Sequence, residues 1–417
     1  MWQVNIFHRK SNKRYASGRH HSTPLETAMN YSEESLKKHF EWQGKLEVVS
    51  RAKVQNKQDL ALAYTPGVAA PCLAIKENND LSYSLTRKWN TVAVITDGSA
   101  VLGLGNIGAE AGMPVMEGKC VLFKEFADVD AIPICLKTQN VDEIVSTIYN
   151  ISSSFGGINL EDISAPRCFD VERRLKEICD IPVFHDDQHG TAIVLAAALK
   201  NALKVVKKDI STARLVINGA GSAGIAIAEF LLLLGAKDLI VCDKAGIIED
   251  VDAFNAAQRN LAKRTNPRDV KGTLAQALKG ADAVIGVSAK DAISKDMVRS
   301  MSKDAIVFAM ANPAPEIMPD DALQAGARIV ATGRSDFQNQ INNVLAFPGI
   351  FRGALDARAT DVNVDMQIAA YEALANLIDN PDETHIIPEP FDKRVVPSIA
   401  KAVKEAAIKT GVAKLTK

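Results

Sequence analysis

The chain has 417 residues, more than one typical domain, and 47% of them are hydrophobic and 24% charged, the balance of a soluble globular protein. We therefore expect two domains, each with its own core. The formal net charge of −1 argues against general attraction to nucleic acid or to a membrane surface, and the apolar run from Phe230 to Leu234 is too short to span a bilayer.

The first 28 residues differ from the rest of the chain. They carry five Lys or Arg, three His and a single acid, Glu26, and show no sustained apolar periodicity. A mitochondrial presequence, a disordered tail and an upstream start site would all have this composition. We expect residues 1–28 to lie outside the fold, and the pattern that follows predicts a helix from Met29 to about Phe40.

Residues 29–190 are predicted to form a first α/β domain. Apolar strand-like runs alternate there with helical or glycine-rich stretches, as is typical of α/β folds. The runs lie at 91–96, 130–136, 157–160 and 181–184, with a glycine-rich stretch over 97–118 and a helix over 141–149. The six cysteines show no spacing typical of zinc sites, which favours a reducing, cytoplasmic location.

A second alternating block over 191–350 predicts a Rossmann-type, doubly wound dinucleotide-binding domain. Its strands are expected at 213–218, 239–242, 283–286 and 305–308. Residues 351–417 have a helical pattern, with Gly411 directly after the last helical run. One face of the preceding helix carries Val364, Ile368, Tyr371 and Leu374. We expect these terminal helices to pack on the first domain.

A dinucleotide site is predicted where the second domain begins. An apolar strand leads into Gly219-Ala220-Gly221-Ser222-Ala223-Gly224, which opens an apolar helix. Glycines let a pyrophosphate approach the backbone, and the helix N-terminus faces its charge. Asp243, 19 positions beyond Gly224, would bind ribose hydroxyls. This acid favours NAD, but the adjacent Lys244 weakens the preference and leaves NADP open.

A second copy of this glycine spacing lies in the first domain, at Gly103-Leu104-Gly105-Asn106-Ile107-Gly108. It does not lead directly from a clear strand into a long amphipathic helix. Isolated matches to the pattern are weak evidence. We therefore interpret it as a loop that shapes the catalytic pocket rather than as a second nucleotide site.

Two adjacent aspartates occur in the string His185-Asp186-Asp187-Gln188-His189-Gly190-Thr191. The string follows an apolar strand and precedes an apolar helix, the position at which open α/β sheets bind ligands. Two neighbouring like charges need a cation, either a metal ion or a lysine. The alternative is that one aspartate caps the helix. The string alone leaves both interpretations open.

Three further fragments carry groups suited to chemistry. Tyr64 precedes a Pro-Gly turn, Lys119 follows the glycine-rich stretch, and Glu161-Asp162 ends a strand. Each has an ordinary explanation by itself: an amphipathic tyrosine, a solvated lysine and a surface acid pair. Only their combination with Asp186-Asp187 points to one site.

Together these strings resemble the malic enzymes. The resemblance covers nearly everything from Met29 to the C-terminus and is carried by five motifs in order. They are Tyr64-Thr65-Pro66-Gly67, Gly103 to Gly108, Glu161-Asp162, His185 to Thr191 and Asn342-Asn343-Val344-Leu345-Ala346-Phe347-Pro348-Gly349. The size is similar to that of the short bacterial form of the family.

The resemblance implies roles for the residues that match. Lys119 looks like the general base that takes the proton of the malate hydroxyl, and it needs a lowered pKa for this role. Tyr64 looks like the general acid that protonates C3 of enolpyruvate. Asp186 would pair with Lys119 or support the metal. Hard oxygen ligands suit Mg²⁺ or Mn²⁺, and the implied ligands are Glu161, Asp162 and Asp187.

Two amides resemble the family's substrate-side asparagines, Asn312 and Asn343, although Asn-Pro and Asn-Asn also favour turns. One departure concerns the substrate carboxylates. Larger eukaryotic malic enzymes have an arginine where this chain has Ala100. The partner of one malate carboxylate is therefore unassigned, and the backbone amides of Gly98, Ser99 and Ala100 are one hypothesis.

The implied activity is the oxidative decarboxylation of (S)-malate to pyruvate and CO₂ with reduction of NAD or NADP. A metal-dependent oxaloacetate decarboxylase on the same scaffold is the nearest alternative, and a catalytically silent nucleotide-sensing module is a second. The resemblance also implies a homodimer. Neither nucleic acid nor a membrane is an expected partner.

Overall fold

The computed structural model describes residues 31–101, 103–251 and 254–415, so the predicted tail over 1–28 lies outside the described residues. The chain divides into two units, residues 1–44 and residues 45–417. Across the described ranges, no helix combines the length and the apolarity needed to cross a bilayer.

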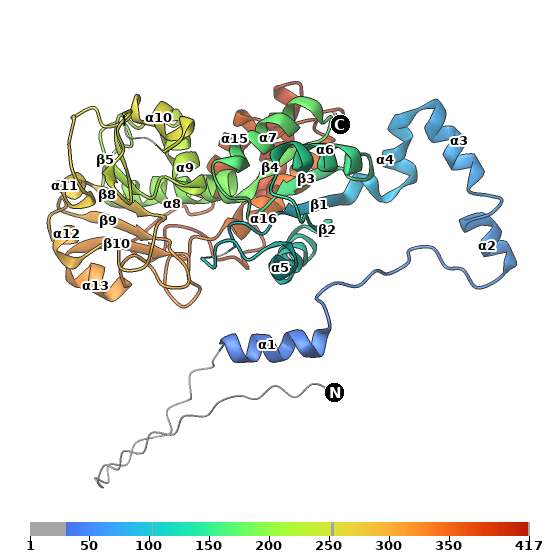
Figure 1. The fold of residues 1–417 in the computed structure, drawn as a ribbon, viewed down its shortest axis with the longest axis horizontal. Coiled ribbons are helices and arrows are strands. Elements are labelled where there is room, and N and C mark those ends of the chain that lie inside the picture. The colour runs from blue at the N-terminus through green and yellow to red at the C-terminus, as the bar shows by residue number, and fades with distance from the viewer. Residues whose placement is uncertain (1–30, 102, 252–253, 416–417) are drawn as a thin grey trace, which may run out of the picture. The chain divides into compact units, whose positions relative to one another are not determined.

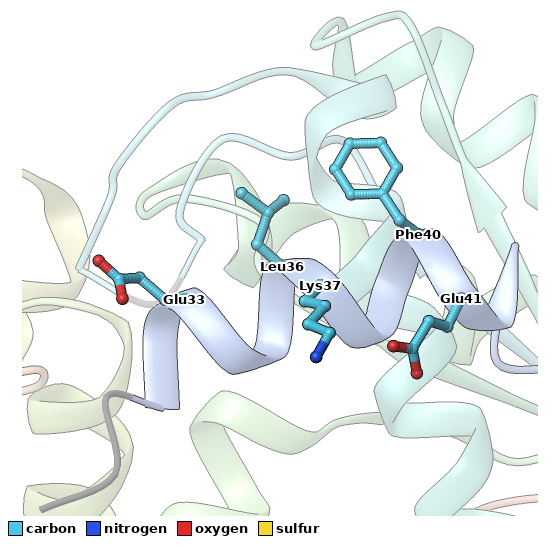
Figure 2. A pocket seen from close by; sticks show the side chains of 5 residues that line it. All are labelled: Glu33, Leu36, Lys37, Phe40 and Glu41. Atoms are coloured by element: carbon cyan, nitrogen blue, oxygen red, sulfur yellow. The ribbon is translucent and has the colours of Figure 1, made fainter. Parts of the chain in front are cut away.

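The first unit contains one described helix, α1 (Tyr31–Trp42), close to the predicted range. Glu33 and Glu34 lie in its first turn, where carboxylates favour the positive end of the helix dipole. Leu36 and Phe40 are four residues apart and point to the same side of the helix (Figure 2). Their side chains are 62% and 76% exposed, so α1 presents an apolar face.

The second unit opens with an N-terminal arm, which we define as residues 45–86. It contains four short helical elements: α2 (Lys57–Ala63), α3 (Ala69–Glu77), η1 (Asn79–Leu81) and α4 (Ser82–Leu85). None of its residues is buried, and none belongs to a hydrophobic core. The arm nevertheless carries large apolar side chains, with Leu62 71% and Leu73 59% exposed. We did not predict the helices of the arm from its sequence.

The first sheet is parallel throughout, with the strand order β2-β1-β3-β4. Its strands are β1 (Thr91–Thr96), β2 (Asp130–Cys135), β3 (Gly157–Leu160) and β4 (Val183–His185). One face, with Ala93 and Ile158, packs on α6 (Val141–Ile151) and α7 (Arg167–Ile178). The other face packs on α5 (Ala109–Ala127). These strands and the predicted helix over 141–149 are confirmed within a few residues.

Helix α5 corrects the interpretation of the glycine-rich stretch. Its 19 residues begin directly after Gly108, so the first glycine motif does open a long helix. The helix was missed because Gly112, Pro114 and Gly118 all disfavour helix interiors. Burial of Met116, Cys120 and Phe123 against the sheet outweighs these local costs.

The second sheet has the order β10-β9-β8-β5-β6-β7, and only β7 is antiparallel. Its strands are β5 (Arg214–Asn218), β6 (Asp238–Asp243), β7 (Gly246–Ile247), β8 (Ala283–Gly286), β9 (Ala305–Ala309) and β10 (Ala327–Thr332). Alternate residues of β5 face different cores: Leu215 and Ile217 lie in one, and Val216 lies in the other. Helices therefore cover both faces, which is the doubly wound arrangement that we predicted.

Two groups of helices cover the two faces of this second sheet. α8 (Thr191–Val205), α9 (Ser222–Leu233) and α10 (Ala256–Ala262) share the core that contains Leu215. The core on the opposite face is shared by α11 (Leu274–Leu278), α12 (Lys295–Arg299) and α13 (Pro319–Gln324). Figure 1 labels the strands β5, β8, β9 and β10 of this sheet and the helices α8 to α13 around it.

The C-terminal helices pack on the first sheet's helices and on α8. They are α14 (Phe347–Ala357), α15 (Val364–Ala375) and α16 (Val395–Lys409), and Gly411 follows α16 with φ 76°. Phe351 of α14 contacts Phe123 of α5 edge to face. Asn201 of α8 donates to the backbone oxygen of Ala375 at 3.0 Å. The domain borders at 190 and 350 stay predictions.

Candidate active site

The candidate site lies at the carboxyl edge of the first sheet. Glu161 and Asp162 follow β3, and Asp186 and Asp187 follow β4 at the start of a π-helical turn, η4 (Asp186–Gly190). The register pairs Leu160 with His185. The residues one position further along each strand therefore meet at the same edge, which is where parallel sheets bind ligands.

Lys119 of α5 reaches this edge from the helix that covers the sheet. Its Nζ lies 2.8 Å from Glu161 Oε1 and also donates to Asp186 Oδ2. Asn343 Nδ2 donates to the same Asp186 oxygen, and Asn159 Nδ2 donates to Glu161 Oε2 at 2.9 Å. Lys119 is 7% exposed, so its ammonium group is held by two buried carboxylates.

The expectation that Lys119 has a lowered pKa is wrong for the chain by itself. Burial disfavours the ammonium form, but attraction by Asp186, Glu161 and Asp187 outweighs burial and raises the pKa of Lys119 above its ordinary value. The lowered pKa that a general base requires is therefore not produced by the chain's own charges. Sequence spacing could not show this, because it does not reveal how many carboxylates surround the lysine.

The two adjacent aspartates have different partners. Asp186 accepts from Lys119 and Asn343, whereas Asp187 Oδ2 accepts the backbone N–H of Asp162 at 2.7 Å. No side chain caps η4 or α8. The helix-cap interpretation of this pair is therefore wrong.

The predicted metal ligands Glu161, Asp162 and Asp187 lie at the same edge, but their side chains do not converge on one point. Within the described ranges, no three His, Cys, Asp or Glu side chains converge as metal ligands do. Asp162 has a left-handed backbone, with φ 53°, which non-glycine residues adopt rarely and often at functional sites.

The charge balance nevertheless fits a divalent cation. Glu161, Asp162, Asp186 and Asp187 meet at one edge, where Lys119 forms ion pairs with Glu161 and Asp186. Burial raises the pKa values of Glu161, Asp186 and Asp187, with Lys119 opposing the shift in each case. Buried carboxylates in excess of cations favour binding of a hard metal ion such as Mg²⁺ or Mn²⁺.

Glu172 of α7 holds the turn that carries the aspartates. Its Oε1 accepts the backbone N–H of His185 at 3.2 Å, and its Oε2 lies 2.9 Å from His189 Nε2. Burial alone would raise the pKa of Glu172, but His189 and Lys176 outweigh it and hold the pKa at about 2. Burial also lowers the pKa of His185 to about 4, so His185 is neutral at neutral pH.

Two predicted site residues are not at this cluster. Tyr64 ends α2 in the N-terminal arm, where it is 68% exposed, and its hydroxyl makes no hydrogen bond to a described residue. Asn312 is exposed in the loop after β9. Of the two predicted amides, only Asn343 therefore contacts the Lys119 cluster.

The backbone amides proposed for a malate carboxylate are already used within the chain. The N–H groups of Gly98, Ser99 and Ala100 donate to the side chain of Thr96, the side chain of Asp97 and the backbone oxygen of Asp162, at 2.9, 3.0 and 3.0 Å. These three N–H groups therefore have partners within the chain, which argues against them as the carboxylate site.

The first glycine motif lies against the Asn312 loop. A Cβ atom on Gly103 would come within 2.4 Å of the backbone oxygen of Asn312, and Gly103 also has a left-handed φ of 73°. Only glycine meets both conditions without strain. The motif thus packs against the loop that follows β9. Its role in shaping the pocket stays a prediction.

The second glycine motif lines a groove of about 690 Å³. Gly219 has φ 125°, and a Cβ there would lie 2.4 Å from the backbone oxygen of Val287, so the turn after β5 requires glycine. Ser222, Ala223 and Gly224 form the first turn of α9. The groove is lined by Asn218, Gly219, Ala220, Gly221, Asp243, Lys244, Ala245, Gly246, Phe254, Gln258, Thr273, Leu274, Ser288, Ala289 and Ala292.

The acid at the end of β6 is oriented within this groove. Asp243 Oδ1 accepts the backbone N–H of Ala245 at 2.7 Å. Lys244 Nζ lies 5.1 Å from the centroid of the Phe254 ring. A dinucleotide's ribose would thus meet a fixed carboxylate, with one lysine close by.

Comparison with known proteins decides the family. Residues 43–176 match the malic enzyme N-terminal domain, and residues 188–413 match the malic enzyme NAD binding domain. The chain belongs to the malic enzyme family. The bifunctional malic/malolactic enzyme of Bacillus subtilis is 56% identical over 93% of this chain and 96% of its own length.

Two further relatives support the family and the fold. The NAD-dependent malic enzyme of Geobacillus stearothermophilus is 54% identical over 89% of this chain and 78% of its own length. The crystal structure of an NAD-dependent malic enzyme from Thermotoga maritima is 47% identical, with a TM-score of 0.87 over 89% of this chain and 98% of that chain. The two-domain α/β malic enzyme fold is therefore shown.

Asp97, Asn159 and Glu172 were missed by the sequence interpretation. Asp97 directly follows a clear strand, the same signal that identified Asp186, so it could have been found. Asn159 bonds to Glu161 only two positions further along the chain, where residues of a strand share a face. Glu172 instead bonds to His189, which comes from a different element. No spacing in the sequence reveals this second contact.

Glu172→Gln should lower the free energy of unfolding at pH 7, because the ionised carboxylate has a depressed pKa and two partners in the folded state. This stability is present above the ordinary pKa of 4.5 and is lost as pH falls towards 2. It amounts to about 3 kcal/mol at most. Urea unfolding at several pH values should show a flatter acid limb for the variant, and a limb parallel to that of the wild type would contradict the role.

Proposed function

We propose that this chain oxidises and decarboxylates (S)-malate to pyruvate and CO₂, using NAD⁺ in preference to NADP⁺ and a divalent metal ion. One observation carries the proposal: a buried lysine bridges carboxylates from two strand ends in a chain that also has an intact dinucleotide groove. The names of its relatives in the malic enzyme family support the same activity.

Lys119 is the proposed base for the proton of the C2 hydroxyl. Asp186 orients its Nζ, and Asn343 positions Asp186, because Lys119 Nζ and Asn343 Nδ2 both donate to Asp186 Oδ2. A divalent cation held by Glu161, Asp162 and Asp187 would offset these negative charges, lower the lysine pKa and withdraw charge from the C2 oxygen. The groove that Gly219 and Asp243 line would hold the dinucleotide, which would supply a hydride acceptor for C2. Asn312, beside Gly103, is the proposed second substrate amide.

Tyr64 is the proposed acid that protonates C3 after loss of CO₂. Because it lies on an exposed arm that has no core of its own, we propose that the arm packs on a second copy of the chain. Such a homodimer would cover the apolar side chains of the arm and bring Tyr64 to the partner's Lys119 cluster. The exposed Leu36 and Phe40 of α1 are a second apolar surface that a dimer could bury.

Two other activities remain alternatives on this site. An oxaloacetate decarboxylase needs the metal site but no hydride acceptor, so the intact dinucleotide groove favours malate oxidation. A malolactic reaction is suggested by the name of the Bacillus subtilis relative, a bifunctional malic/malolactic enzyme. Assays that quantify pyruvate, lactate and NADH from malate, and pyruvate from oxaloacetate without a dinucleotide, separate the three.

Asp187→Asn should abolish malate-dependent NADH formation, because it removes a charged oxygen from the proposed metal ligands. We expect Mn²⁺ affinity to fall by at least about 10-fold in calorimetry, while NAD⁺ affinity stays unchanged. Asp128→Asn, a change of the same type at an exposed position, is the control. Unchanged Mn²⁺ affinity in Asp187→Asn would remove this residue from the proposed ligands.

Tyr64→Phe and Lys119→Met chains, each inactive alone, should complement one another when co-expressed. If Tyr64 acts across the dimer, each mixed dimer has one intact site, so random pairing restores about a quarter of the wild-type activity. Copurification through two different tags measures the mixed dimers directly. Mixed dimers without activity would show that Tyr64 and Lys119 act within one chain.

Asp243 and Lys244 should shift cofactor preference in opposite directions. Asp243→Ser removes the carboxylate that repels a 2′-phosphate, so kcat/KM for NADP⁺ relative to NAD⁺ should rise by about 10-fold or more. Lys244→Gln should lower the same ratio. Initial rates with both cofactors in parallel provide the measurement, and a preference that neither variant moves would place specificity elsewhere in the groove.

A further inference from the structure

We propose that Arg167 binds the malate carboxylate that Lys119 and the proposed metal ion leave free. This inference rests on the proposed function, because it names the partner of that function's own substrate. Malate carries two carboxylates into an edge that already holds four. A cation besides Lys119 and the proposed metal ion is therefore needed, because an anion buried without a counter-charge costs far more than one that is paired.

Arg167 lies beside this edge and is oriented by a buried acid. It begins α7, and its Nη2 donates to Asp97 Oδ2 at 3.1 Å. Asp97 is 2% exposed, and its other oxygen accepts the backbone N–H and the hydroxyl of Ser99. β1 pairs with β3 so that Ile95 faces Leu160, which places Asp97 next to Asp162 at the carboxyl edge. The guanidinium is thereby held at the Asp162 side of the proposed metal site.

Most of the donor capacity of Arg167 is unused. Its Nε is buried without a partner, and its Nη1 makes no hydrogen bond to any described residue. Arg352 is the useful comparison, because its Nε and Nη1 both donate and its Nη2 pairs with Asp356. Arg352, whose side chain is 16% exposed, thus has a partner at each of its three nitrogens, whereas Arg167, at 27%, keeps donors for an oxyanion.

Arg167 also lies where the two domains meet. The next residue, Cys168, has its Sγ 3.5 Å from the Oγ of Ser222 in the dinucleotide motif. The pyrophosphate of the cofactor is therefore a competing ligand with similar chemistry. The bond to Asp97 favours the substrate carboxylate, because it directs the guanidinium towards the first sheet rather than towards α9.

The test compares Arg167→Gln with Arg173→Gln, a control on the same helix whose arginine makes exposed ion pairs. Calorimetry with Mn²⁺ and NADH present measures binding of (S)-malate and of (S)-lactate, which lacks only the second carboxylate. We expect Arg167→Gln to weaken malate binding by about 10- to 100-fold and lactate binding by less than about twofold. Arg167→Lys should recover part of the loss, and Arg173→Gln should match the wild type.

Three results would overturn the inference. Unchanged malate binding in Arg167→Gln would show that Arg167 does not contact malate. Equal losses of malate and lactate binding would indicate a general structural defect. Weaker binding of NAD⁺ and ADP-ribose with unchanged malate binding would assign Arg167 to the pyrophosphate. A wild-type protein that neither binds nor oxidises malate would instead contradict the proposed function itself.

Discussion

The buried ammonium group of Lys119 is the interaction on which the rest of the site depends. It joins a helix, α5, to the ends of two strands through Glu161 and Asp186. It also lies 4.1 Å from the centroid of the Phe347 ring in α14, so the C-terminal helices contribute to its surroundings. Without this charge, Glu161 and Asp186 would lose their ion-pair partner, and the repulsion between the carboxylates at this sheet edge would rise.

The same charge arrangement sets the chemical requirement of the site. The carboxylates that stabilise the ammonium group also keep it protonated, so the chain by itself holds its proposed base in the inactive form. An added divalent cation would reduce the repulsion between the carboxylates and would also lower the pKa of Lys119. It would do so because it offsets their negative charge and competes with the lysine for them. We propose that metal dependence follows from this negative charge, with Asp186 serving the lysine and Asp187 the ion.

The elements that could be predicted from the sequence are those whose local residue preferences favour the same structure as their burial in the fold. Strands such as Thr91–Thr96 are apolar runs with clear ends, and the glycine motif at Gly219 has its strand and helix in place. Helix α5 was missed because Gly112 and Pro114 contradict its tertiary burial. The position of Tyr64, the raised pKa of Lys119 and the ion pair of Arg167 could not be predicted, because they depend on charges and surfaces that are distant in the sequence.

The most direct test of this account is single-turnover NADH formation from malate by the wild type and by Lys119→Met, with Mn²⁺ present and NAD⁺ binding measured separately. Methionine keeps the unbranched chain, one heavy atom shorter, but removes the base. The account predicts that the rate falls by about 100-fold or more while NAD⁺ affinity is retained. A Lys119→Met enzyme that oxidises malate at the wild-type rate would contradict the central role of this lysine.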